Sequence, residues 1–382
     1  MSPPPGGLIF LGFQGKEDTH MWGMILGTAL ALALAAVVYL AVCFHRFSFI
    51  RGLERKSRLL SWLAALAPIA LLGCFALINV TALVVVLLHL MAAFLLCALA
   101  AFLIRRLAGR EVPYDLRGAA AIALTAVYLG VGWYMAHHVF ETDYRLESAK
   151  LKSDMRVVML ADAHLGITLD GADFAREMER VQALAPDAVV LVGDFVDDDS
   201  EREDMVAACR ALGELKTTYG VYFVYGNHDE GYYRFRNFDG AELRAELEKN
   251  GVTVLEDESV PLGDSLCLIG RRDRSDRGRA SIAALTEGLD PALFTLVLDH
   301  QPNDYAAEAE AGVDLVVSGH THGGHIFPAG QIGLLMGAND ALYGLERRGN
   351  TDFIVTSGIS GWAIPFKTGC RSEFVVIDLA AA

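Results

Sequence analysis

The pattern of apolar and polar positions changes character near residue 145. Before it, long apolar runs are separated by short charged loops. A bilayer core about 30 Å thick requires about 20 apolar residues of helix to cross it. Four runs reach this length, so we expect an all-α bundle of four transmembrane helices. They are residues 21–44, 59–78, 82–104 and 118–139.

The positive charges of this half lie mainly in two of its loops. The loop after the first run carries five Lys or Arg residues, and the loop after the third run carries four. Loops rich in Lys and Arg stay in the cytoplasm, so both chain ends are expected on the other side. We therefore predict a multi-pass protein of the plasma or inner membrane, with its remaining half outside the cytoplasm.

Beyond residue 150, short apolar runs alternate with amphipathic stretches. The runs are about five residues long and almost continuously apolar, as in strands that are covered on both faces. Between them, apolar residues recur every three or four positions, which is the period of a helix packed on one face. The pattern predicts an α/β domain. Its expected strands include residues 156–160, 188–192, 221–225, 294–298 and 313–317.

These patterns divide the chain into three parts. Residues 1–142 are the predicted membrane anchor, residues 143–154 a polar linker, and residues 155–382 the α/β domain. Charge also separates the halves, because residues 1–150 contain 12 Lys and Arg against 8 Asp and Glu, whereas residues 151–382 contain 20 against 39. A domain with this acidic composition lacks the basic surface that binds a phosphate backbone. Nucleic acid is therefore not an expected partner.

Each of the five expected strands is followed at once by polar residues of metal-binding type. In α/β sheets, the loops beyond the carboxyl ends of strands converge on one crevice, so we expect one shared site. Six of the 11 His residues lie beyond residue 150, all in or beside these loops. Mixed imidazole and carboxylate groups suit Mn, Fe or Zn and not Ca, and we favour Mn. The candidate site residues in and beside the five loops are Asp162, His164, Asp194, Asn227, His228, Asp229, His300, His320, His322 and His325.

The five motifs resemble the calcineurin-like metallophosphoesterase superfamily, and more closely its bacterial membrane-anchored branch. They are Asp162-Ala163-His164, Gly193-Asp194, Gly226-Asn227-His228-Asp229, Asp299-His300 and Gly319-His320-Thr321-His322. The resemblance implies a four-layer α-β-β-α sandwich that binds two divalent metals. One metal would be held by Asp162, His164 and His322, the other by Asn227, His300 and His320, with Asp194 bridging both. His228 would contact the substrate phosphate and donate a proton, and Asp229 would orient it.

Two cations ~3.5–4 Å apart can hold phosphate oxygens and acidify a bridging water, which then attacks phosphorus in line. The predicted activity is therefore hydrolysis of a phosphate ester, either a phosphodiester or a lipid- or envelope-linked substrate, beside membrane lipid. Two alternatives remain. One is a non-catalytic metal-binding membrane sensor. The other is a cytoplasm-facing pyrophosphatase of nucleotide-linked lipid precursors, which contradicts the predicted orientation.

Two further features bear on the substrate. His325 stands where this branch commonly has glutamine after the double glycine, and it either faces the substrate or is a solvated loop residue. The basic run that contains Arg271, Arg272 and Arg274 is unusual in so acidic a domain. Its guanidinium groups either bind an anionic substrate or lipid headgroup, or belong to a solvated loop balanced by nearby acidic residues.

Overall fold

The computed structural model describes residues 16–382, except residues 78 and 232–235. The chain divides into two compact units, Met1–Val131 and Gly132–Ala382. Residues 1–15 of the predicted anchor and Ile78, which ends the second predicted span, lie outside the described residues.

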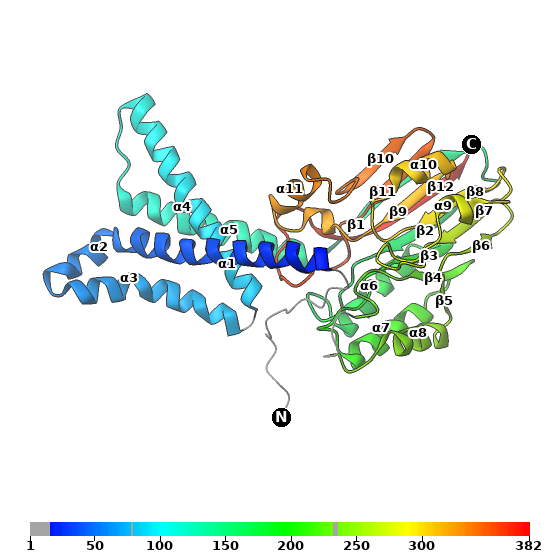
Figure 1. Ribbon diagram of the computed structural model, residues 1–382, viewed down its shortest axis with the longest axis horizontal. Helices are drawn as coiled ribbons and strands as arrows, with labels where there is room; N and C mark the ends of the chain where they lie inside the picture. The colour runs from blue at the N-terminus through cyan, green and yellow to red at the C-terminus, as the bar shows by residue number, and fades with distance from the viewer. Residues whose placement is uncertain (1–15, 78, 232–235) are drawn as a thin grey trace. The chain divides into compact units, whose positions relative to one another are not determined.

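The described residues of the first unit form helices and short connections (Figure 1). The helices are α1 (Lys16–His45), α2 (Ser48–Gly52), the 3-10 helix η1 (Leu53–Arg55), α3 (Arg58–Leu72), the 3-10 helix η2 (Gly73–Leu77), α4 (Val80–Ala108) and α5 (Tyr114–His137), which continues into the second unit. Ser57 and Asn79 begin α3 and α4, because their side chains accept the backbone N–H groups of Leu60 and Ala82. Such caps satisfy donors that a helix leaves unpaired at its first turn.

Three segments of the described residues are long and apolar enough to cross a membrane. They are Arg58–Ala76, Val80–Ala108 and Tyr114–His137. Leu30–His45 and Ser48–Arg55, which are bent by 69° relative to each other, would add a fourth if they form one span. The sequence predicted four spans, and the described helices give three or four depending on this bent pair.

The second unit contains two six-stranded sheets in its described residues. The first has the order β1-β12-β2-β3-β4-β5 and the second the order β10-β11-β9-β8-β7-β6. Strands of the first sheet are β1 (Val139–Ser148), β2 (Met155–Leu160), β3 (Ala188–Val192), β4 (Gly220–Val224), β5 (Val252–Val254) and β12 (Ser372–Ala381). Strands of the second are β6 (Glu258–Leu262), β7 (Leu266–Gly270), β8 (Phe294–Leu298), β9 (Leu315–Ser318), β10 (Gly344–Arg348) and β11 (Thr351–Val355).

Helices connect these strands and cover the sheets. They are α6 (Gly171–Ala183), α7 (Arg202–Gly213), α8 (Gly240–Lys249), α9 (Ile282–Thr286), α10 (Tyr305–Ala311), the 3-10 helix η3 (His322–Gly324) and α11 (Ala329–Leu335). All five strands expected from the sequence are present, within two residues of the expected bounds. The mixed α/β fold predicted for this half is therefore found.

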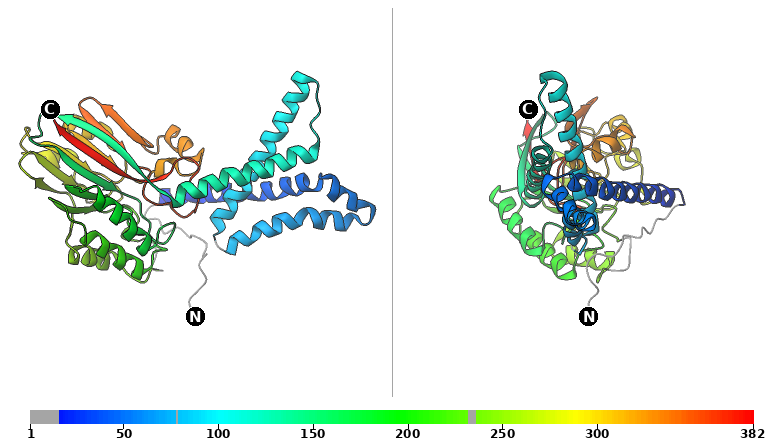
Figure 2. Two further views of the ribbon diagram at one scale, coloured as in Figure 1. Left: turned by 180° about the vertical axis from the view of Figure 1, so that it is seen from behind. Right: turned by 90° about the vertical axis from the view of Figure 1, so that its left-hand side faces the viewer.

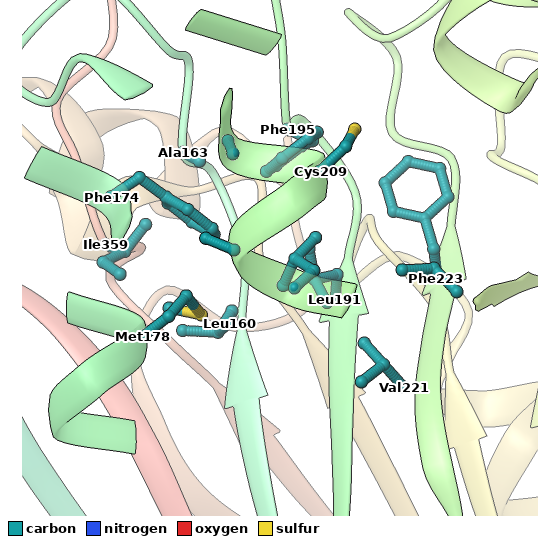
Figure 3. Close-up of a cluster of buried hydrophobic side chains, with 14 of the residues drawn as sticks. Leu160, Ala163, Phe174, Met178, Leu191, Phe195, Cys209, Val221, Phe223 and Ile359 are labelled. Carbon is teal, nitrogen blue, oxygen red and sulfur yellow. The ribbon is translucent and has the colours of Figure 1, made fainter. Parts of the chain in front are cut away.

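Three apolar clusters hold the second unit together. The inner faces of the two sheets share one cluster, in which Val190 of β3 and Leu296 of β8 are fully buried. The other face of the first sheet packs on α6, α7 and α8. Figure 3 shows Phe174 and Met178 of α6 beside Leu160, on this face. A smaller cluster joins α9 and α10 to the second sheet. Helices thus cover the face of each sheet that points away from the other sheet.

Strand β1 corrects the linker expected at residues 143–154. Residues 139–148 form a ten-residue strand that pairs in parallel with β12 (Figure 2). Its alternate positions are exposed, as in an edge strand with one face toward solvent. The linker prediction is wrong for residues 143–148. Polar residues occupy every second position of this strand, and they made the segment resemble an unstructured connection.

Candidate metal centre

The predicted metal-binding residues gather where the parallel strands of the two sheets end. Asp162 and His164 follow β2, Asp194 follows β3, His300 follows β8 and His320 follows β9. Hydrogen bonds join the two sheet edges. Nδ1 of His300 lies 2.8 Å from the backbone oxygen of Val192 at the end of β3. The backbone N–H of His320 donates to Oδ1 of Asp162 at 2.9 Å.

These loops hold an unusual backbone conformation. Nine described residues other than glycine have a positive φ, and six of them are predicted site residues. The six are Asp162, His164, Asp194, His320, His322 and His325. Side chains disfavour this region sterically, and such residues persist where the surrounding structure holds them. The fold therefore accepts local strain to direct these side chains into one place.

Two glycines allow the loops to approach each other closely. A Cβ atom on Gly226 would lie 2.3 Å from Oδ1 of Asp194, and one on Gly193 would lie 2.5 Å from Nδ1 of His300. Gly193 also has a φ of 77°. Any side chain at either position would push on a predicted metal ligand, which explains why the motifs need glycine there.

The first ligand cluster consists of Asp162, His164 and His322, all buried. One potential ligand atom from each lies within 4.8 Å of the others. Nε2 of His322 is 3.2 Å from Nε2 of His164. These three residues are the set that the resemblance implied for one metal.

Asp197 supports this cluster and was missed in the sequence. Its buried carboxylate places Oδ2 3.2 Å from Nδ1 of His164. A carboxylate at Nδ1 favours the proton on that nitrogen and leaves Nε2 with a lone pair for a cation. The available signal was a second acidic residue three positions after Asp194, on the same loop.

The second ligand cluster consists of Asp194, His300 and His320. Asn227 joins it, because its Oδ1 lies 2.9 Å from Nδ1 of His320. Burial and the neighbouring His300 lower the pKa of His320 to about 4. Its imidazole is therefore neutral near pH 7, the form that can bind a metal.

Asp194 lies between the two clusters. Its Oδ2 is 3.1 Å from Nε2 of His300 and 3.6 Å from Nε2 of His164. Burial opposes its ionisation, but the surrounding imidazoles, His300 first, hold its pKa well below the ordinary value. The carboxylate is thus charged and within reach of both groups of ligands.

The residues present fit a pair of divalent cations. The backbone oxygen of Val192 accepts only from an N–H, so Nδ1 of His300 carries a proton and Nε2 faces Asp194. Burial alone would lower the pKa of His300, yet the Asp194 and Asp162 carboxylates raise it well above the ordinary value. This position therefore favours positive charge, which a bound cation would supply. Buried imidazole and carboxylate donors without a thiolate suit Mn, Fe or Zn.

His228 borders both clusters. Its backbone N–H donates to Oδ1 of Asp194 at 2.9 Å. Its ring lies 5.1 Å from the ring of His164 and 5.6 Å from that of Trp362, measured between centroids. Trp362 was not expected from the sequence, because its loop follows β11 and carries no metal-binding motif.

Asp229 has a different role from the one expected. Its two oxygens accept four backbone hydrogen bonds, from Asp194, Phe195, Val196 and Gly226, at 2.7–3.1 Å. The side chain is fully buried. It therefore fastens the loop that carries Asp194 to the start of its own loop. This makes Asp229 a positioning residue for Asp194, where the sequence suggested that it orients His228.

The three arginines divide into different environments. Arg271 is buried and pairs with Asp299, Asp304 and Glu308 at 2.8–3.0 Å. Its expected role in substrate binding is wrong, since its guanidinium is already engaged by three carboxylates. Arg272 is partly exposed and lies 3.0 Å from Asp276.

Arg274 remains as a candidate contact for an anion. It is exposed, and none of the described residues forms a hydrogen bond or ion pair with its guanidinium. His325 is not a solvated loop residue, because its Nε2 is buried without a hydrogen-bond partner. Burial and the nearby Lys367 lower the pKa of His325 to about 3, so its ring is neutral. Its ring stacks on that of His322, with 5.4 Å between centroids.

Lys367 is a second residue that the sequence reading missed. It is fully buried, and its Nζ donates to the backbone oxygens of Ser357 and Gly358 at 2.6 and 3.2 Å. A Cβ on Gly358 would lie 2.6 Å from Cβ of Asp162. Lys367 thus secures the loop that packs against a predicted metal ligand. A single Lys outside any motif gives no signal in the sequence.

Comparison with known proteins finds one matching family profile and several proteins that are similar to parts of this chain. Residues 155–324 match the profile of the calcineurin-like phosphoesterase family. An uncharacterized metallophosphoesterase of Campylobacter jejuni is 31% identical over 61% of this chain and 61% of its own length. A Bos taurus protein described as a transmembrane protein with a metallophosphoesterase domain is 33% identical over 60% of this chain and 54% of its own. A dimetal phosphatase from Danio rerio has a TM-score of 0.36 at 11% identity, over 58% of this chain and 91% of that structure.

The chain spans about half to three fifths of the length of these two curated relatives. Homologous metallophosphoesterases occur in bacteria and in animals, and the relatives from Bos taurus and Danio rerio are named as transmembrane proteins. Five ordered motifs, two clusters of His and Asp and the profile match all lie in the same α/β unit. The chain therefore carries a domain of the calcineurin-like metallophosphoesterase family, whose members are metal-dependent phosphoester hydrolases.

Proposed function

We propose that this protein is a membrane-anchored, two-metal hydrolase of phosphate esters. The observation that carries the proposal is the position of Asp194, with one oxygen 3.1 Å from His300 and 3.6 Å from His164. These histidines belong to different ligand clusters. A carboxylate shared in this way sets the spacing of a binuclear centre, which suits phosphoryl chemistry and has no use in a single structural site.

Each residue of the centre has a proposed task. Asp162, His164 and His322 would hold one cation, and Asn227, His300 and His320 the other, with Asp194 between them. Two divalent cations, when bound, would neutralise phosphate oxygens and lower the pKa of a water. His228 would bind the phosphate and hold a proton for the leaving group, since its ring borders both clusters. Arg274 and His325 would contact the rest of the substrate.

The proposed setting is a membrane surface outside the cytoplasm. The two basic loops of the first unit support this orientation by their Lys and Arg content. The catalytic unit would have four layers, α-β-β-α, which the burial of apolar residues between the sheets and beneath the helices supports. A phosphodiester or a lipid- or envelope-linked ester is the proposed substrate class.

Hydrolysis of two chromogenic esters tests the catalytic proposal. The full chain, purified in detergent and stripped of metal, should hydrolyse bis-p-nitrophenyl phosphate or p-nitrophenyl phosphate only after Mn²⁺ is restored. Asp194→Asn should lose metal and activity together, whereas Asp264→Asn, an exposed carboxylate outside the centre, should lose neither. Stoichiometric metal binding without turnover of either ester would contradict the proposal and favour a metal-binding sensor.

Reporter fusions at the C-terminus test the orientation. A reporter that works only outside the cytoplasm should be active, because the nine cations of the two basic loops should remain inside. Activity only from a cytoplasm-dependent reporter would reverse the orientation. It would also make nucleotide-linked lipid precursors available as substrates.

A further inference from the structure

An exposed apolar segment follows the last metal-ligand loop directly. Nine large hydrophobic residues are exposed among the described residues of the second unit, and five of them lie within residues 327–336. They are Phe327, Ile332, Leu334, Leu335 and Met336, of which Leu335 is 88% and Met336 80% exposed. Helix α11 buries none of its residues. Such a concentration of apolar side chains on a surface marks an interaction site.

The segment also lacks charge. Residues 326–339 contain no Asp, Glu, Lys, Arg or His, within a half of the chain that has 59 Asp, Glu, Lys and Arg in 232 residues. Fourteen consecutive uncharged residues contrast with the composition around them. A partner of this segment must therefore be apolar itself, and it gains nothing from ion pairs.

Hydrogen bonds connect this segment to the end of α5. The backbone N–H of Phe327 donates to Oγ1 of Thr368, and the N–H of Thr368 donates to the backbone oxygen of His325. The N–H of Lys367 donates to the backbone oxygen of Gly132 at 2.9 Å. All these residues belong to the second unit. Residues 367 and 368 therefore connect the apolar segment to α5, since Thr368 bonds to Phe327 and Lys367 bonds to Gly132.

The end of α5 has the character of a membrane boundary. Tyr114–His137 is one of the candidate spans. Trp133 and Tyr134 are exposed on its last turns and stack on His137 and His138, respectively. Exposed Trp and Tyr at the end of an apolar helix are typical of the interface between hydrocarbon and water. Helix α5 ends at His137 and strand β1 begins at Val139, so one residue lies between them.

We propose that residues 326–339, which include α11, dock on the lipid bilayer that α5 enters. Continuity with the boundary at Trp133 and Tyr134 selects a lipid surface over a protein partner. Apolar side chains that reach the acyl region are stabilised in proportion to the area they bury. Docking fixes the orientation of the catalytic unit on the membrane.

Docking also brings the metal centre to the lipid surface. Gly330 of α11 packs against Gly324, since a Cβ on Gly330 would lie 2.2 Å from the Cα of Gly324. Gly324 follows the predicted ligand His322 by two residues. The substrate is then a phosphate ester of a membrane lipid, presented from the bilayer. This part of the inference rests on the proposed hydrolase function, whereas docking itself does not.

Photo-crosslinking in nanodiscs tests docking without any need for activity. p-Benzoylphenylalanine replaces Leu335 in the full chain. Because the Leu335 side chain is highly exposed, this replacement should not disturb folding. Val127, exposed on α5, is the positive control, and Lys249, exposed on α8, is the negative control. Illumination should yield a phospholipid adduct at positions 335 and 127 and none at 249. An adduct at 127 without one at 335, or an adduct of 335 with a second protein chain, would overturn docking.

A second measurement separates docking from catalysis. Leu335→Gln combined with Met336→Gln should lower hydrolysis of a phospholipid in nanodiscs at least tenfold and leave bis-p-nitrophenyl phosphate hydrolysis and metal content unchanged. Equal hydrolysis of the lipid by the variant and the parent would overturn the lipid-substrate inference. If the lipid adduct forms but the metal-loaded parent hydrolyses no ester, docking stands and the hydrolase proposal fails.

Discussion

The replacement of Asp229 by Asn tests how the fold holds the metal centre. The Asp229 carboxylate accepts backbone N–H groups from Asp194 and Gly226 at Oδ2, and from Phe195 and Val196 at Oδ1. Asn has the same size, but one of its two terminal atoms is an NH₂ group. In either orientation of the amide, two buried N–H donors would face another donor.

The expected loss follows from these two unpaired donors. A buried donor without an acceptor costs about 1–3 kcal/mol, so Asp229→Asn should cost about 2–6 kcal/mol of unfolding free energy. For a unit of this size, 1 kcal/mol corresponds to about 2–4 °C, so the melting temperature should fall by roughly 4–24 °C. Metal affinity should fall as well, because the loop that carries Asp194 loses its attachment.

Thermal unfolding and metal content measure these effects in the full chain. Glu230→Gln is the matched control, since it removes a charge at the next position from an exposed side chain. We expect the control to resemble the parent in both measurements. If Asp229→Asn and Glu230→Gln share one melting temperature and one metal content, the four hydrogen bonds do not hold the site and the reasoning fails.

Three further predictions concern individual side chains. His228→Ala should keep both metals and lose about 10²–10⁴-fold in rate on alkyl esters but less on nitrophenyl esters, whose leaving group needs no proton; metal loss measured by elemental analysis would instead make it a ligand. Arg274→Ala should raise KM for an anionic substrate, and Arg210→Ala, an exposed arginine on α7, should not; equal KM values would remove the proposed contact. Lys367→Met leaves the buried carbonyl oxygen of Ser357 without a donor, at about 1–3 kcal/mol, whereas that of Gly358 still accepts the backbone N–H of Glu373. It should lower the melting temperature and the metal content through the loop against Asp162, and a normal metal content would refute this link.

Much of the centre could be predicted from the sequence, because its residues occur in short motifs at strand ends. Continuous apolar runs identified β3 and β8 within their true bounds. Parallel strands align their carboxyl ends, so the loops after them had to converge. The strand ends thus predicted one shared site, and the resemblance to the metallophosphoesterase family implied that Asp162, His164 and His322 share one metal, although His322 lies 158 residues from His164.

Residues outside the motifs could not be assigned in this way. Arg271 and Arg274 are three positions apart in one basic run, yet one is buried among three carboxylates and the other is exposed. Composition reports that charges are present, but the location of their partners depends on segments distant in the chain. Asp299, Asp304 and Glu308 follow Arg271 by 28 to 37 residues and carry no sign of the pairing.

The sequence by itself determined the division into an apolar half and an α/β half, the main strands and the candidate ligand residues. Those properties depend on local periodicity and on short motifs, which the chain carries wherever it folds. Only the tertiary structure decided that Asp197 and Lys367 support the centre, that Asp229 fastens the Asp194 loop, and that residues 139–148 form a strand. These features depend on which distant segments meet, and a partner chosen by packing leaves no local pattern in the sequence.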